Sequence, residues 1–221
     1  MLAEVAELGD IFRSGGRRLY LVGGTVRDLL LGAPTEDLDY DATTDARPEE
    51  IKKLIAPWAD AVWTQGEKFG TIGARKGARV YEITTHRADA YHSDTRKPDV
   101  EFADAIETDL SRRDFTVNSL ALEVTSDSPS LVDPFDGALD LMSRTLRTPL
   151  DPEVSFGDDP LRMMRAARFI ARFGLVPVPG LVDAVHRMKD RLNIVSAERI
   201  RDELDKLIVV DSPDRKSTRL N

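Results

Sequence analysis

A glycine pair and an aspartate pair near the start of the chain have the residue types and spacing best suited to chemistry. Gly23 and Gly24 end the apolar run 19–22 and precede a short apolar segment, a pattern that predicts a strand, a tight turn and a helix. Backbone amides at such a turn suit a phosphate group. Asp37 and Asp39 lie two residues apart, which places both carboxylates on one side of an extended segment. Carboxylate oxygens suit Mg²⁺, so the combination predicts a metal-dependent nucleotidyl transfer site.

Residues around these two pairs extend the prediction. Glu82, inside a predicted strand at 79–85, is a candidate third carboxylate from a neighbouring strand. Arg27 is a candidate contact for a triphosphate or for the metal-site carboxylates, with a surface ion pair as the alternative. Thr25 and Asp28 predict a capping box for the helix that ends at Gly32.

A second cluster combines two arginines with an aspartate. The arginines suit phosphate, and Asp114 suits hydrogen bonds from ribose hydroxyls. A charged helix end before an apolar run is the alternative interpretation. The cluster is Arg112-Arg113-Asp114-Phe115-Thr116-Val117-Asn118.

A third cluster begins at Asp158-Asp159-Pro160. Asp159 followed by Pro160 predicts a helix N-cap and first turn. At 100° per residue the arginines that follow share an arc of roughly 120° on one helix face, with no acidic residue between Pro160 and Val182. The stripe predicts contact with a nucleotide or RNA, and a solvated helix face is the alternative. Its members are Arg162, Arg165, Arg168 and Arg172.

The elements that must hold these clusters change character along the chain. Strands and helices mix over about the first 140 residues, which predicts an α+β domain. We expect helices at 1–12, 48–55, 106–114 and 116–122, and a long polar loop at 87–99. From Asp158 the pattern is helical, at 160–173, 180–188 and 197–209. The predicted domains are 1–150 and a helical 151–210, with a boundary within 150–156 and a polar tail at 211–221.

Composition limits the classes of protein that remain. The chain has 221 residues, 41% of them hydrophobic and 32% charged, which is typical of a soluble globular protein. No apolar stretch approaches the roughly 18 residues of a membrane helix, and residues 1–18 lack a signal-peptide pattern, so we expect no membrane association and a cytoplasmic location. The absence of cysteine excludes disulfides and thiolate metal sites. The net charge of −8 argues against indiscriminate nucleic-acid binding.

Taken in order, the motifs resemble the N-terminal part of a class II CCA-adding enzyme, in the family of tRNA nucleotidyltransferases and bacterial poly(A) polymerases. The first catalytic motif of that family is similar to residues 21–28 with Asp37-Leu38-Asp39, and the ribose-recognition motif to residues 112–118. The hinge motif is similar to Asp133-Pro134-Phe135-Asp136-Gly137. The family motif of an acidic residue, Asp, two further residues and Arg is similar to Asp158-Asp159-Pro160-Leu161-Arg162, and the supporting helix of the family is similar to residues 198–204.

The resemblance implies a nucleotidyltransferase head with a mixed sheet and helices, followed by an all-helical neck. It implies Asp37 and Asp39 as catalytic Mg²⁺ ligands and places Arg113 and Asp114 near the ribose. Asp159 and Arg162 would pair with the base of incoming CTP or ATP, so that the protein acts as the template. The nucleotide-binding residues expected with them are Gly23, Gly24, Arg27, Asn118, Arg165 and Arg168.

The implied activity is addition of nucleotides from CTP and ATP to the 3′ end of tRNA, with release of pyrophosphate. Poly(A) polymerase shares these motifs and is the first alternative. An inactive RNA-binding fragment is the second, because the helical body and tail domains of the family are absent from this sequence. The sequence names no protein partner.

The chain departs from the family pattern at three places, of which Asp158-Asp159 in place of the frequent Glu-Asp is the mildest. The first motif continues as Asp37-Leu38-Asp39-Tyr40-Asp41, one residue longer than usual, so Asp39 and Asp41 form an alternative metal pair. Counting from the glycines favours Asp37 and Asp39. The segment Arg215–Asn221 replaces an expected apolar helix, which predicts a truncated or non-native end.

Overall fold

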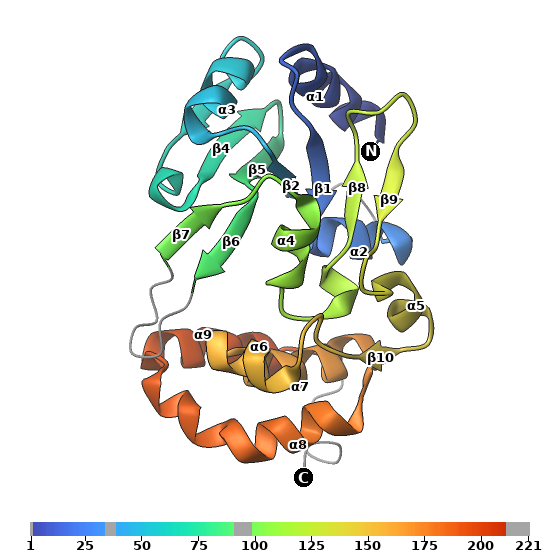
Figure 1. Cartoon of the computed structure of the whole chain (residues 1–221), viewed down its shortest axis with the longest axis vertical. Coiled ribbons are helices and arrows are strands. Elements are labelled where there is room, and N and C mark those ends of the chain that lie inside the picture. The colour runs from blue at the N-terminus through green and yellow to red at the C-terminus, as the bar shows by residue number, and fades with distance from the viewer. Residues whose placement is uncertain (1, 34–38, 91–98, 211–221) are drawn as a thin grey trace.

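A seven-stranded mixed sheet forms the upper part of the molecule (Figure 1). The structure is a computed structural model that describes residues 2–33, 39–90 and 99–210. The strand order is β3-β4-β5-β2-β1-β8-β9, and the neighbouring pairs are antiparallel except for the parallel pair β2 and β5. The bounds are β1 Leu19–Val22, β2 Tyr40–Thr44, β3 Ala61–Trp63, β4 Thr71–Lys76, β5 Arg79–Thr85, β8 Ala121–Glu123 and β9 Ser130–Val132.

Helices α1 (Leu2–Ser14) and α3 (Pro48–Ile55) pack together against this sheet. The core between them contains Leu8, Phe12 and Ile51, which solvent does not reach. The elements near the lower end of the sheet are shorter. They are α2 (Gly24–Leu30), α4 (Ile106–Ser111), the 3₁₀ turn η2 (Thr116–Asn118) and α5 (Gly137–Met142), and a further 3₁₀ turn η1 (Glu67–Phe69) precedes β4.

The C-terminal helices form the lowest layer in Figure 1. Within it α6 packs on α8 and α7 packs on α9, while β10 pairs in parallel with β11. The bounds are β10 Thr145–Leu146, α6 Pro152–Asp158, α7 Arg162–Phe173, β11 Val176–Pro177, α8 Pro179–Met188, η3 Lys189–Ile194 and α9 Ala197–Ile208.

A second hydrophobic core joins the two layers. Phe169 of α7 packs against Phe115, with ring centroids 5.2 Å apart, and Val117 and Leu146 belong to the same cluster. Side chains from both sides of the predicted 150–156 boundary therefore share one core. This packing fixes α7 against the segment that follows α4.

Three local predictions are wrong. Residues 116–122 are not a helix, because only the single turn η2 forms before β8, which pairs with β1 at the centre of the sheet. Residues 87–99 are not simply a loop, because β6 (Arg87–Ala90) pairs with β7 (Asp99–Phe102). The capping box is also absent: Gly23 caps α2, and no side chain bonds to the first turn.

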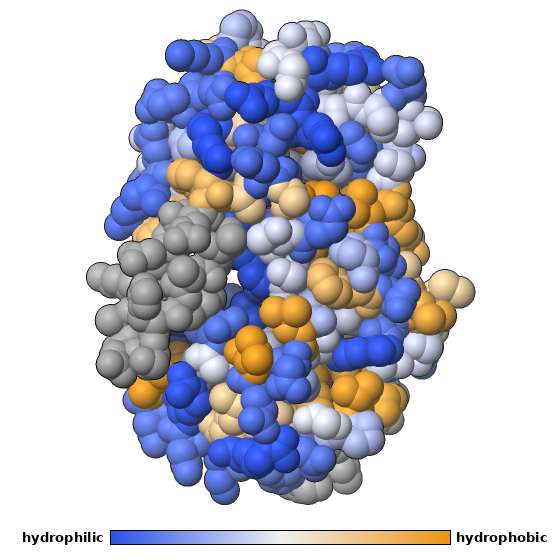
Figure 2. All heavy atoms as spheres, in the orientation of Figure 1, coloured by the Kyte–Doolittle hydropathy of each residue, from blue (hydrophilic) through white to orange (hydrophobic). Residues whose placement is uncertain are grey.

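The surface in Figure 2 is mostly hydrophilic, with larger apolar groups along the right flank beside α5. Among the exposed large apolar side chains are Leu139 and Met142 of α5, Leu131 of β9, and Leu30 and Leu31 at the end of α2. Across the described ranges, every helix is too short or too polar to cross a bilayer.

Candidate active site

A cavity of about 330 Å³ contains most of the residues that the sequence singles out. Its walls come from the turn after β1, from β2, from the segment 112–118 after α4, and from the turn between α6 and α7 with parts of α7 and α9. The lining residues are Gly23, Gly24, Asp41, Arg112, Arg113, Asp114, Asn118, Asp159, Leu161, Arg162, Arg165 and Arg199.

The glycine turn requires its glycine at position 23. Gly23 has a φ of 64°, in the left-handed region that disfavours side chains. A Cβ at this position would lie 2.7 Å from Nη1 of Arg113, so the arginine packs directly over the turn. The amide of Gly23 donates to the carbonyl of Leu120, 3.1 Å away, which ties the turn to the segment before β8.

Two described aspartates lie on either side of the first residue of β2. Asp39 directly precedes the strand, and Asp41 lies within it, in register with Glu82 of the parallel strand β5. Thr25 joins them to α2, because its hydroxyl donates to the carbonyl of Asp39 at 3.3 Å and accepts from the amide of Asp41 at 3.2 Å. Asp37 lies outside the described residues.

The electrostatics around Asp39, Asp41 and Glu82 favour a positively charged ligand. Asp41 keeps contact with solvent, yet neighbouring atoms remove part of its hydration, and this desolvation raises the pKa of its carboxyl. The charges of Glu82 and Asp39 raise that pKa further, and Arg113 opposes them. Over the described ranges, no group of three or more histidine, aspartate or glutamate side chains converges to hold a metal. As candidate metal ligands the start of β2 therefore offers the pair Asp39 and Asp41, with Glu82 beside Asp41.

Asp114 lies at the junction of the sheet layer and the C-terminal helices. Its Oδ1 accepts from the amide of Phe115 and from Nδ2 of Asn118, each at 2.9 Å. Its Oδ2 accepts from Nε and Nη2 of Arg165, at 2.9 and 2.5 Å. Burial alone would raise the pKa of Asp114, but Arg165 and Asn118 outweigh it and hold that pKa below its usual value.

The turn between α6 and α7 carries Asp159 and Arg162. Oδ1 of Asp159 accepts from the amide of Leu161 at 3.2 Å, and its Oδ2 accepts from Nη2 of Arg199 on α9 at 2.8 Å. Arg162 is buried, and it donates to Oγ of Ser155 at 2.8 Å and to the carbonyl of Arg112 at 2.5 Å. Asp159 is thus not the N-cap of α7, which is Leu161, although its carboxylate does hold the turn that leads into the helix.

The sequence matches the model of a known protein family over most of the sheet layer. Residues 19–147 match the poly A polymerase head domain. The chain belongs to this family. Residues 179–220 match a second model, described as the probable RNA and SrmB-binding site of polymerase A.

Curated and solved relatives of this head-domain chain are named CCA-adding enzymes. The one from Leuconostoc citreum is 40% identical over 197 residues, which are 89% of this chain and 47% of the relative. The Bacillus stearothermophilus enzyme, solved with CTP, has a TM-score of 0.81 and 33% identity over 92% of this chain and 47% of its own. The Thermotoga maritima enzyme, solved with tRNA, has a TM-score of 0.79 and 29% identity over 97% of this chain and 48% of its own. The chain spans about half the length of the curated relatives it matches.

The cavity brings together residues from both sides of the family match. Gly23, Gly24, Arg113, Asp114 and Asn118 lie within the head-domain match, whereas Asp159, Arg162 and Arg165 lie beyond it. Sequence reasoning assigned Arg112 to the cluster that suits phosphate but named only Arg113 of the two as a binding residue, and it gave Arg199 no role in the site. Both stand next to or within the recognised motifs, so proximity to a motif was the signal that pointed to them.

Arg27 and Arg168 are candidates that do not line the cavity. Arg27 is buried behind Asn118, donates to Oδ1 of Asn118 at 2.6 Å and lies over the ring of Phe173. Arg168 pairs with Glu203 of α9. The predicted uncompensated arginine stripe is therefore wrong, because Asp114 and Glu203, distant in sequence, neutralise two of its members.

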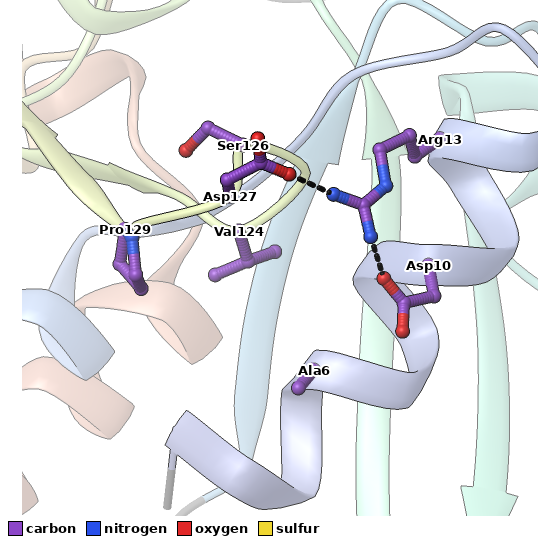
Figure 3. Close-up of a pocket in the computed structure, with 7 residues that line it drawn as sticks. All are labelled: Ala6, Asp10, Arg13, Val124, Ser126, Asp127 and Pro129. Carbon is purple, nitrogen blue, oxygen red and sulfur yellow. Dashed lines mark hydrogen bonds and ion pairs between the residues drawn. The ribbon is translucent and has the colours of Figure 1, made fainter.

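A second cavity of about 190 Å³ lies between α1 and the connection from β8 to β9 (Figure 3). Arg13 points between Asp10 and Asp127 in that view and forms an ion pair with each. Its charge is therefore compensated, and we assign this cavity no role. The lining residues are Ala6, Asp10, Arg13, Val124, Ser126, Asp127 and Pro129.

Proposed function

We propose that this chain carries the nucleotide-adding centre of a CCA-adding tRNA nucleotidyltransferase. The observation that carries the proposal is one cavity that combines a glycine turn, the carboxylate of Asp41, several arginines and the start of α7 with Asp159 and Arg162. Asp39 does not line the cavity but directly precedes the strand that carries Asp41. In the proposed reaction the 3′-hydroxyl oxygen of tRNA bonds to the α-phosphorus of CTP or ATP. The bond between the α- and β-phosphates breaks, and pyrophosphate leaves.

For the metal ligands we propose Asp39 and Asp41 in place of Asp37 and Asp39. Thr25 bonds to the backbone of both residues, which holds them beside the glycine turn, and Asp41 lines the cavity. Desolvation, and after it the charges of Glu82 and Asp39, raise the pKa of the Asp41 carboxyl, and a bound divalent cation would offset these charges. Carboxylate oxygens are ligands that Mg²⁺ prefers, so these residues fit Mg²⁺. When bound, Mg²⁺ would make the attacking hydroxyl more acidic and offset charge on the leaving pyrophosphate. Glu82 remains a proposed additional carboxylate.

The arginines and the glycine turn are proposed to hold the triphosphate. Gly23 and Gly24 line the cavity, with Nη1 of Arg113 next to Gly23, and Arg112 and Arg113 offer guanidinium donors to phosphate oxygens. Arg27 supports this wall from behind, through Asn118. Asp114 is proposed to face the ribose.

Base choice is proposed to lie with Asp159 and Arg162. A carboxylate accepts a hydrogen bond from the exocyclic amine that cytosine and adenine share, and a guanidinium donates to ring acceptors. Guanine and uracil present a different arrangement, which leaves buried groups unpaired. Arg199 supports the proposal, because its bond to Oδ2 of Asp159 fixes the carboxylate that would read the base.

The 3′ end of tRNA is the proposed second substrate. The match of residues 179–220 to a model described as a probable RNA-binding site supports RNA contact by the C-terminal helices. We propose residues 1–150 as the head and 151–210 as a neck that reads the nucleotide. The tail 211–221 lies outside the described residues, and a cytoplasmic location remains a prediction.

Poly(A) polymerase activity is the second candidate, because the matched head family carries that name. The two activities differ in base choice, since a poly(A) polymerase uses ATP alone. Binding of CTP as tightly as ATP would favour the CCA-adding type.

Equilibrium dialysis of CTP, ATP, GTP and UTP with Mg²⁺ tests the proposal on this chain. We expect preference for CTP and ATP, lost in Arg162→Ala. Incorporation of labelled CMP into tRNA that lacks its terminal CCA then measures turnover. Selective binding without incorporation would support an inactive fragment, and equal binding of all four nucleotides would contradict the base-reading proposal.

A further inference from the structure

A buried aspartate outside the cavity anchors two arginines inside it. Asp109 of α4 has 0% exposure. Its Oδ1 accepts from Nη2 and Nε of Arg112, at 2.9 and 3.2 Å, and its Oδ2 accepts from Nη2 of Arg113 at 3.0 Å. The spacing of three and four residues brings all three side chains to one side of the helix end.

This arrangement directs both guanidinium groups. Asp109 also accepts from the amide of Arg87 at 3.3 Å, so the carboxylate is itself fixed to β6. Arg113, held by Oδ2, lies against the glycine turn, where its Nη1 would meet a Cβ of Gly23 at 2.7 Å. Arg112 in turn restrains Arg162, because the backbone carbonyl of Arg112 accepts from Nη2 of Arg162.

The charge on Asp109 is maintained by the same two arginines. Burial alone would raise the pKa of this carboxyl, but Arg113 and Arg112 outweigh it and hold the pKa far below its usual range. An ionised acceptor forms stronger hydrogen bonds than a neutral one. The anchor is therefore ionised at neutral pH, with Arg112 and Arg113 as ion-pair partners.

We propose that Asp109 is a positioning residue for nucleotide binding, which aims Arg112 and Arg113 at the β- and γ-phosphates. The inference rests on the proposed triphosphate site and adds to it a residue that touches neither nucleotide nor metal. Without the anchor Arg113 is no longer held against the glycine turn and Arg112 loses its fixed direction, so the terminal phosphates lose their donors. Contacts to the base, the ribose and the α-phosphate stay in place.

The test compares the affinities for CTP and CMP in the presence of Mg²⁺, measured by calorimetry on the whole chain. These ligands differ only in the two phosphates that the arginines are proposed to hold. In Asp109→Asn we expect the preference for CTP over CMP to fall about tenfold or more, with little change in the affinity for CMP. Asp109→Glu keeps the charge but shifts the carboxylate, so its preference should fall less.

Asp140→Asn is the matched control. Asp140 is also a buried carboxylate, 1% exposed, that pairs with an arginine (Arg147) and accepts from Thr116, but Arg147, unlike Arg112 and Arg113, does not line the cavity. Its loss should lower the free energy of unfolding as Asp109→Asn does. We expect it to leave the preference for CTP over CMP unchanged, which separates positioning from general support of the fold.

The outcomes separate this inference from the proposed function. An unchanged preference in folded Asp109→Asn, or an equal loss in both variants, would overturn the positioning role while the triphosphate site stands. No preference for CTP in the unmodified chain would overturn the triphosphate site itself, and the inference with it. If Asp109→Asn does not fold, the preference measured on Asp109→Glu decides by the same criterion.

Discussion

Arg165 of α7 occupies an oxygen of Asp114 that the proposed ribose contact needs. Two donors of Arg165 bond to Oδ2 of Asp114, while Phe115 and Asn118 bond to Oδ1. An ionised carboxylate has about four acceptor positions, so a ribose hydroxyl must share an oxygen with these donors or displace one. Because α7 also carries Arg162, ribose recognition and base reading act on the same helix.

Replacing Arg165 with alanine should destabilise the fold. The change leaves Asp114 buried without its ion-pair partner, and breaking fully buried pairs costs roughly 3–5 kcal/mol. The side chain of Arg165 is 33% exposed, so we expect a smaller loss of about 2 kcal/mol in the free energy of unfolding. Urea denaturation measures it. Arg187→Ala, which removes an exposed pair with Glu153, should cost about 0.5 kcal/mol, and equal losses would contradict the importance of the Asp114 contact.

Stability should fall in acid because of Asp109 and Asp114. Both carboxyls have a folded pKa below the usual 3.8. A carboxyl with a lowered folded pKa adds stability above its unfolded pKa, and this contribution is lost as the pH falls through the folded value. The free energy of unfolding should therefore decline as the pH drops below 3.8, and less steeply in Asp109→Asn. Identical pH dependence of the free energy of unfolding in the unmodified chain and in Asp109→Asn would contradict the ion pairs assigned to Asp109.

Local sequence patterns gave the glycine turn, helix α3 and the helices after Asp158. Each of these has its own signals, such as Pro48 at the first turn of α3. The sequence did not distinguish strand from helix at 120–123, where pairing with β1 overrides local preference. Contacts with neighbouring strands decide whether such a segment forms a strand or a helix, and those partners cannot be identified from the residues nearby in sequence.

Partners distant in sequence explain the other differences. The arginines of α7 looked uncompensated because Asp114 lies 51 residues before Arg165, and Glu203 lies 35 residues after Arg168. Asp109 lies in the predicted helix at 106–114 without being singled out, and only its burial and its bonds to Arg112 and Arg113 show that it anchors two arginines. The pair Asp37 and Asp39, counted from the glycines, stays a prediction, because Asp37 lies outside the described residues.

Three single variants distinguish the two proposed metal pairs. Asp39→Asn and Asp41→Asn should abolish Mg²⁺-dependent CTP binding, whereas Asp37→Asn should retain it. The expected difference follows from the contacts of Thr25, which hold the backbone of Asp39 and Asp41 beside the glycine turn. Calorimetric titration with Mg²⁺ and CTP gives the result. Loss of binding in Asp37→Asn with retention in Asp41→Asn would restore the pair counted from the glycines.

Asp41→Asn should also raise stability when no divalent cation is present. The raised pKa of Asp41 means that its ionised form is less favourable in the folded chain than in the unfolded one. Removing that charge relieves repulsion with Glu82 and Asp39. Thermal unfolding with a chelator at neutral pH checks this, and a lower melting temperature in the variant would contradict it.

Gly23→Ala should weaken CTP binding more than its effect on stability explains. Gly23 combines a φ of 64° with a ψ of −128°, a backbone conformation that costs about 1–3 kcal/mol for other residues, and the new Cβ would also push against Nη1 of Arg113. Gly16→Ala is a control for alanine at a positive φ, because its φ is 70° and nothing lies within 4 Å of a Cβ there. Both variants should lose stability, Gly23→Ala the more, but only Gly23→Ala should lose CTP affinity. Equal affinities would contradict the role of the turn.

Arg162→Ala should relax base choice more than it weakens triphosphate binding. We expect the preference for CTP and ATP over GTP and UTP to fall about tenfold or more, because the variant removes donors to the base. Arg162 also bonds to Ser155 and to the carbonyl of Arg112, so part of any effect comes from the turn itself. Ser155→Ala removes one of those supports and keeps the guanidinium. If Ser155→Ala relaxes base choice as much as Arg162→Ala does, the arginine acts by holding the turn and does not read the base.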